Sequence, residues 1–138
     1  MHNASKVLMG STVSNVREVD NRAGTIAAGL AVRLSSASAI SVALADGSLL
    51  GISLGKSLSD TARTAICRKG LGVPVKLASG FTPTVGAQVH ISDTTGEAAA
   101  SGSGKTGVNA VYASGVLTGV FEDGTEANVA LIDFPGGL

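Results

Sequence analysis

The sequence predicts an all-β fold, and three observations lead to this prediction. Apolar residues alternate with polar or small ones over most of residues 28–134, as in strands with one buried face. Two Asp-Gly pairs, at 46–47 and 123–124, separate such segments and favour the tight turn of a β-hairpin. No stretch of ten or more residues has the 3.6-residue apolar period of an amphipathic helix. We therefore expect an antiparallel β sandwich or jelly roll.

The expected strands follow one another along the chain. In order, they are residues 30–34, 40–44, 50–54, 73–77, 87–91, 116–120 and 127–132. The last is mostly apolar and is interpreted as a buried final strand, and Pro135 prevents the tail from continuing it. The best helical candidate, residues 58–66, is short, so we expect at most one short helix.

An N-terminal arm is expected to precede a single β domain. Residues 1–24 mix polar and charged residues with apolar ones too sparse to form a core, so we expect an extended arm that becomes ordered against a partner. Residues 25–138 are long enough for one hydrophobic core. The candidate contacts to a partner are Val7, Leu8, Met9, Arg17, Arg22 and Phe134.

Charge and composition argue against several classes of partner. Ten basic and ten acidic residues cancel and are scattered, whereas a nucleic-acid-binding surface usually combines a basic stripe with stacking aromatics. No segment has the roughly 18 uninterrupted apolar residues of a membrane span, and the first residues lack the pattern of a signal peptide. We expect neither a nucleic acid nor a membrane as partner.

A glycine-rich segment at residues 99–106 resembles a relaxed phosphate-binding loop in which Ala replaces the first Gly. That loop requires a hydrophobic strand before it and a helix after it, so that backbone N–H groups converge on a phosphate. Polar residues 93–97 precede this segment and a predicted strand at 108–112 follows it. We therefore interpret it as a flexible loop between strands.

The other reactive side chains are too dispersed for catalysis or metal binding. The histidines are His2 and His90, whereas a metal-binding jelly roll needs several His and a Glu that converge. Cys67 has no second cysteine with which to form a disulfide and lies in an apolar run, which favours an inert packed thiol. We expect no enzyme activity, no metal and no cofactor.

Glycine, turn and strand signals recur in a definite order along residues 24–134. They are Ala28-Gly29, Leu50-Gly51-Ile52, Gly72-Val73-Pro74-Val75, Gly86-Ala87-Gln88-Val89-His90-Ile91, Thr95-Gly96, Gly115-Val116-Leu117-Thr118-Gly119 and residues 124–132. This order resembles the small capsid cement, or decoration, proteins of tailed bacteriophages. Residues 1–24 depart from the common pattern of that family.

The resemblance implies a jelly-roll-like protein that binds the outer surface of an expanded phage head. Such proteins bridge neighbouring major capsid subunits and stabilise the shell against the internal pressure of DNA. The implied partners are the phage major capsid protein and neighbouring copies of the chain, with a dimer favoured. The implied location is the capsid exterior, with the host cytoplasm as the site of assembly.

Two alternatives from other classes remain open. One is a carbohydrate-binding jelly-roll adhesin, although a chain with no Trp and one Tyr offers few aromatic rings on which a sugar can stack. The other is a tail or baseplate β module of a phage.

Overall fold

A computed structural model describes residues 6–8, 15–20, 26–34, 40–42, 49–56, 63–121 and 124–138. Within these ranges the secondary structure consists of strands and turns, so the all-β prediction is confirmed. The described strands are, in chain order, β1 (Lys6–Leu8), β2 (Asn15–Asp20), β3 (Ala31–Leu34), β4 (Ile40–Val42), β5 (Leu49–Lys56), β6 (Arg63–Lys76), β7 (Gln88–Ser92), β8 (Ala98–Ala99), β9 (Lys105–Tyr112), β10 (Leu117–Val120) and β11 (Glu126–Phe134).

The strands form an open, mostly antiparallel sheet. Its main path of eight strands runs β4-β3-β5-β6-β11-β9-β7-β8. Beside this path, β10 pairs with β11, β1 pairs in parallel with β10, and β2 pairs with β6. Among the described residues, an isolated bridge from Leu77 to Ala98 connects the end of β6 to β8, and the path does not close into a barrel.

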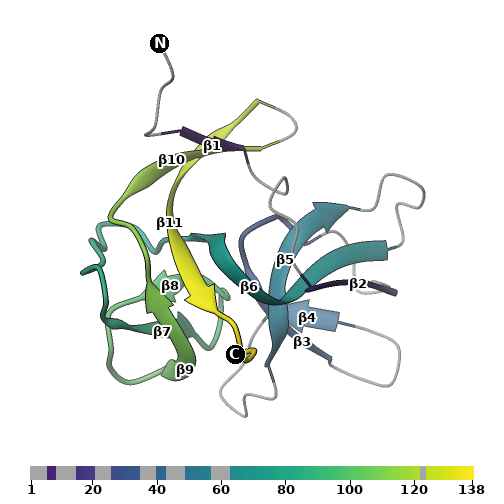
Figure 1. The fold of residues 1–138 in the computed structure, drawn as a ribbon, viewed down its shortest axis with the longest axis horizontal. Coiled ribbons are helices and arrows are strands. Elements are labelled where there is room, and N and C mark those ends of the chain that lie inside the picture. Colours follow the sequence, from purple (N-terminus) through teal and green to yellow (C-terminus); the bar gives the residue numbers. More distant parts are fainter. Residues whose placement is uncertain are drawn as a thin grey trace.

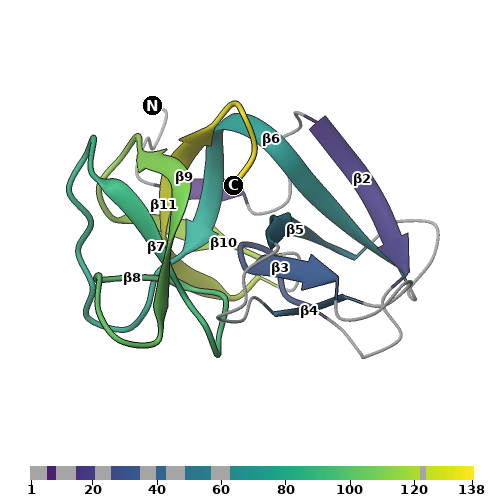
Figure 2. The ribbon, with the colours of Figure 1, turned by 90° about the horizontal axis from the view of Figure 1, so that it is seen from below.

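Strand β6 connects the two halves of the sheet. Its first part pairs with β2 and β5, and its second part pairs with β11. Figure 1 shows β6 passing between a group of strands that contains β3, β4 and β5 and a group that contains β7, β8 and β9. Figure 2 shows β2 running beside the first part of β6. One strand of 14 residues therefore belongs to both halves.

Apolar side chains of the alternating segments build the core. The largest fully buried ones are Phe134, Ile52, Ile66, Ile91, Ile132, Val32, Val73, Val75, Val89 and Val129. Full burial of a side chain of this size contributes about 1.5–3 kcal/mol relative to leaving it exposed. Most of the predicted strands contribute to this list, because their alternation determines which residues face inward.

The helical candidate at residues 58–66 is wrong over its described part. Strand β6 already begins at Arg63, so the last four residues of the candidate are strand. Residues 63–66 pair with β2 on one edge and β5 on the other. The β-branched Thr64 and Ile66 suit such a position, where packing against both neighbours outweighs a weak helical pattern.

Two parts of the predicted arm lie in the sheet of the domain. Strand β1 pairs with β10 from Lys6 and Thr118 to Leu8 and Val120. Strand β2 pairs antiparallel with β6 along its whole length. These segments therefore extend the sheet of the domain itself, while the boundary at residue 24 and the ordering of the arm on a partner stay predictions.

Candidate docking surface

A β-bulge interrupts the pairing of β6 with β11. Two residues of β6, Leu71 and Gly72, lie opposite Asp133 of β11, where an unbroken ladder would have one. The N–H of Gly72 donates a hydrogen bond of 2.7 Å to Oδ1 of Asp133. Gly72 has a φ of +64°, which L side chains rarely adopt and glycine adopts at no steric cost. The Gly72 conformation and the Asp133 carboxylate together fix the bulge.

The bulge turns Leu71 outward. Counting back from Val75 and Val73, which are fully buried, alternation would place Leu71 on the same buried face. Leu71 is instead 66% exposed, because the extra residue reverses the direction of the side chains at this point. The chain therefore displays a large apolar side chain on a backbone held by a specific hydrogen bond.

Leu71 borders a shallow depression, which we call the outer groove. Its volume is about 460 Å³, and its lining includes Leu71, Gln88, Asn109, Val111, Asp133 and Pro135. Val111 lies directly opposite Asp133 in the ladder between β9 and β11 and is 43% exposed. The groove thus combines two exposed apolar side chains with polar groups of three strands.

Two cations lie in β6 before Leu71 and are not among the residues that line the outer groove. Arg68 and Lys69 precede Leu71 in β6, and both are exposed. The backbone of Arg68 also lies next to the tail, since its carbonyl oxygen is 3.5 Å from the point where a Cβ on Gly137 would stand. Within the part of the chain that the structure describes, neither side chain forms an ion pair or a hydrogen bond. Among those residues, no carboxylate pairs with either positive charge.

A second depression, of about 320 Å³, shares Gln88 with the lining of the outer groove. Its lining includes Phe81, Thr84, His90 and Tyr112. The rings of Phe81 and Tyr112 pack at a tilt of 52°, with their centroids 6.1 Å apart. The Tyr112 hydroxyl is buried and has no hydrogen-bond partner in the described structure, and burial raises its pKa to about 12. Because this hydroxyl is sealed from solvent, it is not available to a molecule in the depression.

A network of backbone hydrogen bonds surrounds residues 29–31, and we call it the turn network. The N–H of Gly29 donates to the carbonyl oxygen of Ser53 at 2.8 Å, and the N–H of Ala31 donates to that of Gly96 at 2.9 Å. The Lys76 N–H donates to the Gly29 carbonyl oxygen, also at 2.8 Å. Residues 29–31 are thereby bonded to β5, to β6 and to the turn before β8.

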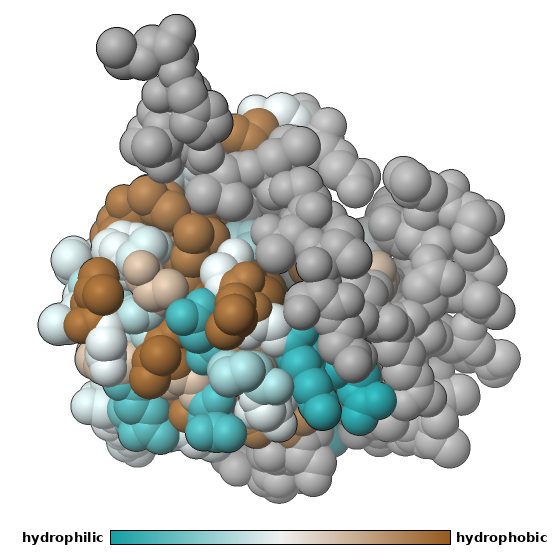
Figure 3. Space-filling model, in the orientation of Figure 1, coloured by the Kyte–Doolittle hydropathy of each residue, from teal (hydrophilic) through white to brown (hydrophobic). Residues whose placement is uncertain are grey.

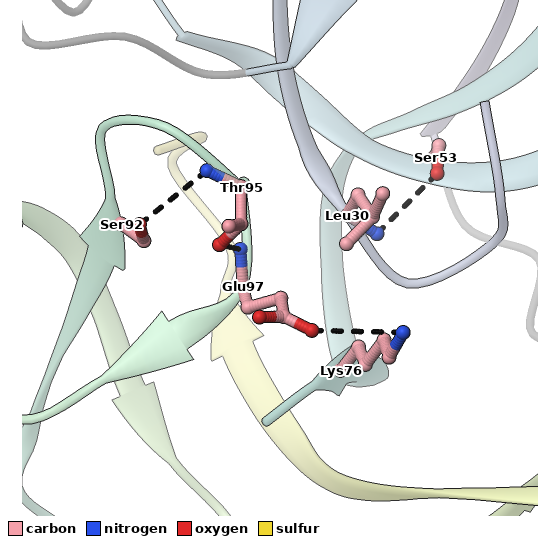
Figure 4. A network of polar contacts seen from close by, with 6 residues as sticks. All are labelled: Leu30, Ser53, Lys76, Ser92, Thr95 and Glu97. Atoms are coloured by element: carbon pink, nitrogen blue, oxygen red, sulfur yellow. Dashed lines mark hydrogen bonds and ion pairs between the residues drawn. The ribbon is translucent and has the colours of Figure 1, made fainter. Parts of the chain in front are cut away.

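Side chains complete the turn network (Figure 4). The Leu30 N–H reaches Oγ of Ser53 at 3.4 Å. Nζ of Lys76 and Oε2 of Glu97 form an ion pair at 3.6 Å. These groups bond to one another, so the network offers no free group to a ligand and acts as a clamp between strands.

The glycine-rich segment is a loop between strands, as predicted. It follows the two-residue strand β8 and leads into β9, so no helix N-terminus stands where a phosphate would bind. The Thr106 hydroxyl donates to Oδ1 of Asp93 at 2.6 Å, and the Asp93 N–H donates to the Gly104 carbonyl oxygen at 2.9 Å. These bonds hold the loop to Asp93, the residue that follows β7.

The thiol and the imidazole singled out from the sequence have ordinary surroundings. Cys67 is fully buried, burial raises the pKa of its thiol, and its Sγ donates to the carbonyl oxygen of Lys69. His90 lies half-buried over Gly107 of β9. Across the described ranges, no group of three or more His, Cys, Asp or Glu side chains is placed to hold a metal ion. These ranges also contain no helix that is long and apolar enough to cross a membrane.

The predicted contact residues fall into three groups. Val7 and Leu8 lie in β1 and Arg17 in β2, while Met9 and Arg22 lie outside the described residues. Phe134 is fully buried, so its side chain packs within the domain. For all six, contact with a partner stays a prediction.

Leu71 is not among the contact residues that the sequence predicts. The available signal was the tripeptide Gly70-Leu71-Gly72, because glycines inside a strand pattern mark a bulge.

Comparisons with protein-family models, with curated proteins and with solved structures find no match.

Proposed function

We propose that this chain is a structural virion protein of a tailed bacteriophage, which binds the outer surface of the head and cements neighbouring major capsid subunits. The order of glycine, turn and strand signals along residues 24–134 carries the proposal. In the structure three of these glycines stand before strands, Gly86 before β7, Gly96 before β8 and Gly124 before β11, whereas Gly51, Gly72 and Gly119 lie within strands. The proposal includes a jelly-roll-like arrangement of the sheet and a location on the capsid exterior.

The surface of the chain is consistent with such a role. The exposed large apolar side chains of the described residues are Leu71, Val85, Val111 and Val116. On the face shown in Figure 3, hydrophobic atoms lie in separate patches among polar ones. Small apolar contacts of this kind are weak singly, but they are repeated by the symmetry of a shell, so many identical contacts add up.

Stabilisation of a shell by a cement protein requires only that the protein binds the assembled shell. A protein that binds the assembled shell and not the free subunits stabilises the shell, because disassembly then requires the bound copies to dissociate. No catalytic group is needed for this effect. The proposal therefore requires a surface with a partner rather than an active site.

The direct test mixes the purified chain with expanded, DNA-free shells of the phage that carries its gene. We expect saturable co-sedimentation with the shells and a higher temperature of shell disruption, measured by light scattering. A chain that does not co-sediment with these shells at micromolar concentration is not a cement protein.

The carbohydrate-binding alternative has one structural feature in its favour. The second depression places Phe81 beside Thr84 and His90, and an aromatic ring with neighbouring polar groups suits a sugar. A glycan array distinguishes the two functions. Binding of a glycan that is lost in Phe81→Ala, together with no binding to shells, would favour the adhesin.

A further inference from the structure

We draw no further inference here: the strongest candidate, the outer groove with the exposed side chains of Leu71 and Val111, is a surface patch for which nothing in the structure shows what covers it.

Discussion

The turn network and the outer groove differ in how they treat polar groups. In the turn network, Gly29, Ala31 and Ser53 exchange hydrogen bonds with neighbouring strands, and Lys76 pairs with Glu97. In β6 before the groove, Arg68 and Lys69 form no ion pair among the described residues, and Leu71, which lines the groove, is exposed. Buried polar groups must be satisfied within the fold, whereas exposed ones remain available to a partner. The difference teaches that exposed groove side chains such as Leu71 can be altered separately from the turn network, whereas Asp133 belongs to the groove and also stabilises the fold through the Gly72 N–H.

The largest expected effect is in the turn network, at Gly96. This residue has a φ of +76°, and a Cβ at this position would stand 2.7 Å from the carbonyl oxygen of Ala31. Gly96→Ala must therefore strain the backbone and push residues 29–31 away from the turn. We expect a loss of about 2–4 kcal/mol in the free energy of unfolding, measured by denaturant titration.

The control for Gly96 is Gly80. Gly80 has nearly the same φ, +75°, but nothing lies within 4 Å of the point where a Cβ would stand. Gly80→Ala should therefore lose only the conformational part, about 1 kcal/mol. Equal losses at the two positions would show that the close approach to Ala31 does not matter.

The next largest effect is expected at the bulge beside the outer groove. Asp133→Ala removes the acceptor of the Gly72 N–H and releases the bulge. We expect a loss of about 1–3 kcal/mol in stability, because this hydrogen bond has a charged acceptor and lies in a partly buried position.

Asp133→Asn is the matched variant, since its amide oxygen can still accept the bond. It should lose less than half as much stability as Asp133→Ala in the same denaturant titration. If both variants are as stable as the parent chain, the bulge does not depend on this carboxylate.

A smaller effect, of opposite sign, is expected at Tyr112. Tyr112→Phe removes a buried hydroxyl that has no partner in the described structure, so the variant should be more stable by up to about 1 kcal/mol at neutral pH. Burial raises the Tyr112 pKa from 10.0 to about 12, so the folded state disfavours the ionised ring. The stability that results is fully present below pH 10 and is lost as the pH rises through 12.

Denaturant titrations between pH 9 and 12 test this sign. The parent chain should lose stability over this window to a greater extent than Tyr112→Phe. A variant that is less stable than the parent chain at neutral pH would reveal a hydrogen bond of the hydroxyl.

The smallest effect is expected at the ion pair of the turn network. Lys76 and Glu97 are partly exposed and 3.6 Å apart, so Lys76→Met should cost about 0.5 kcal/mol or less. The loss should shrink further in high salt. A cost above about 2 kcal/mol would mean that the pair is far less solvated than its exposure indicates.

The sequence was sufficient for the elements that depend on local alternation. Val73, Val75 and Ile132 follow a two-residue period, and each is buried as that period requires. The hairpin before β11 was also predictable, since β10 and β11 pair antiparallel on either side of 123–124. The turn at 46–47 lies outside the described residues.

The sequence was insufficient where long-range pairing decides the outcome. Residues 63–66 become strand because β2 and β5 flank them, and neither contact is visible in the local pattern. Leu71 is exposed because of a bulge whose partner, Asp133, is 61 residues from Gly72 along the chain. The main candidate for a docking surface therefore depends on a contact that periodicity does not encode.

The sharing of β6 between the two halves of the sheet has a consequence for cooperativity. Neither half can open without giving up one of its own strands, because the same backbone completes both. The halves therefore form a single cooperative unit, and slow amide exchange in β5 and in β11 should report the same opening free energy. Under the proposed function, a chain bound to a shell would keep its whole surface or lose all of it, with no half-open state from which a contact could dissociate gradually.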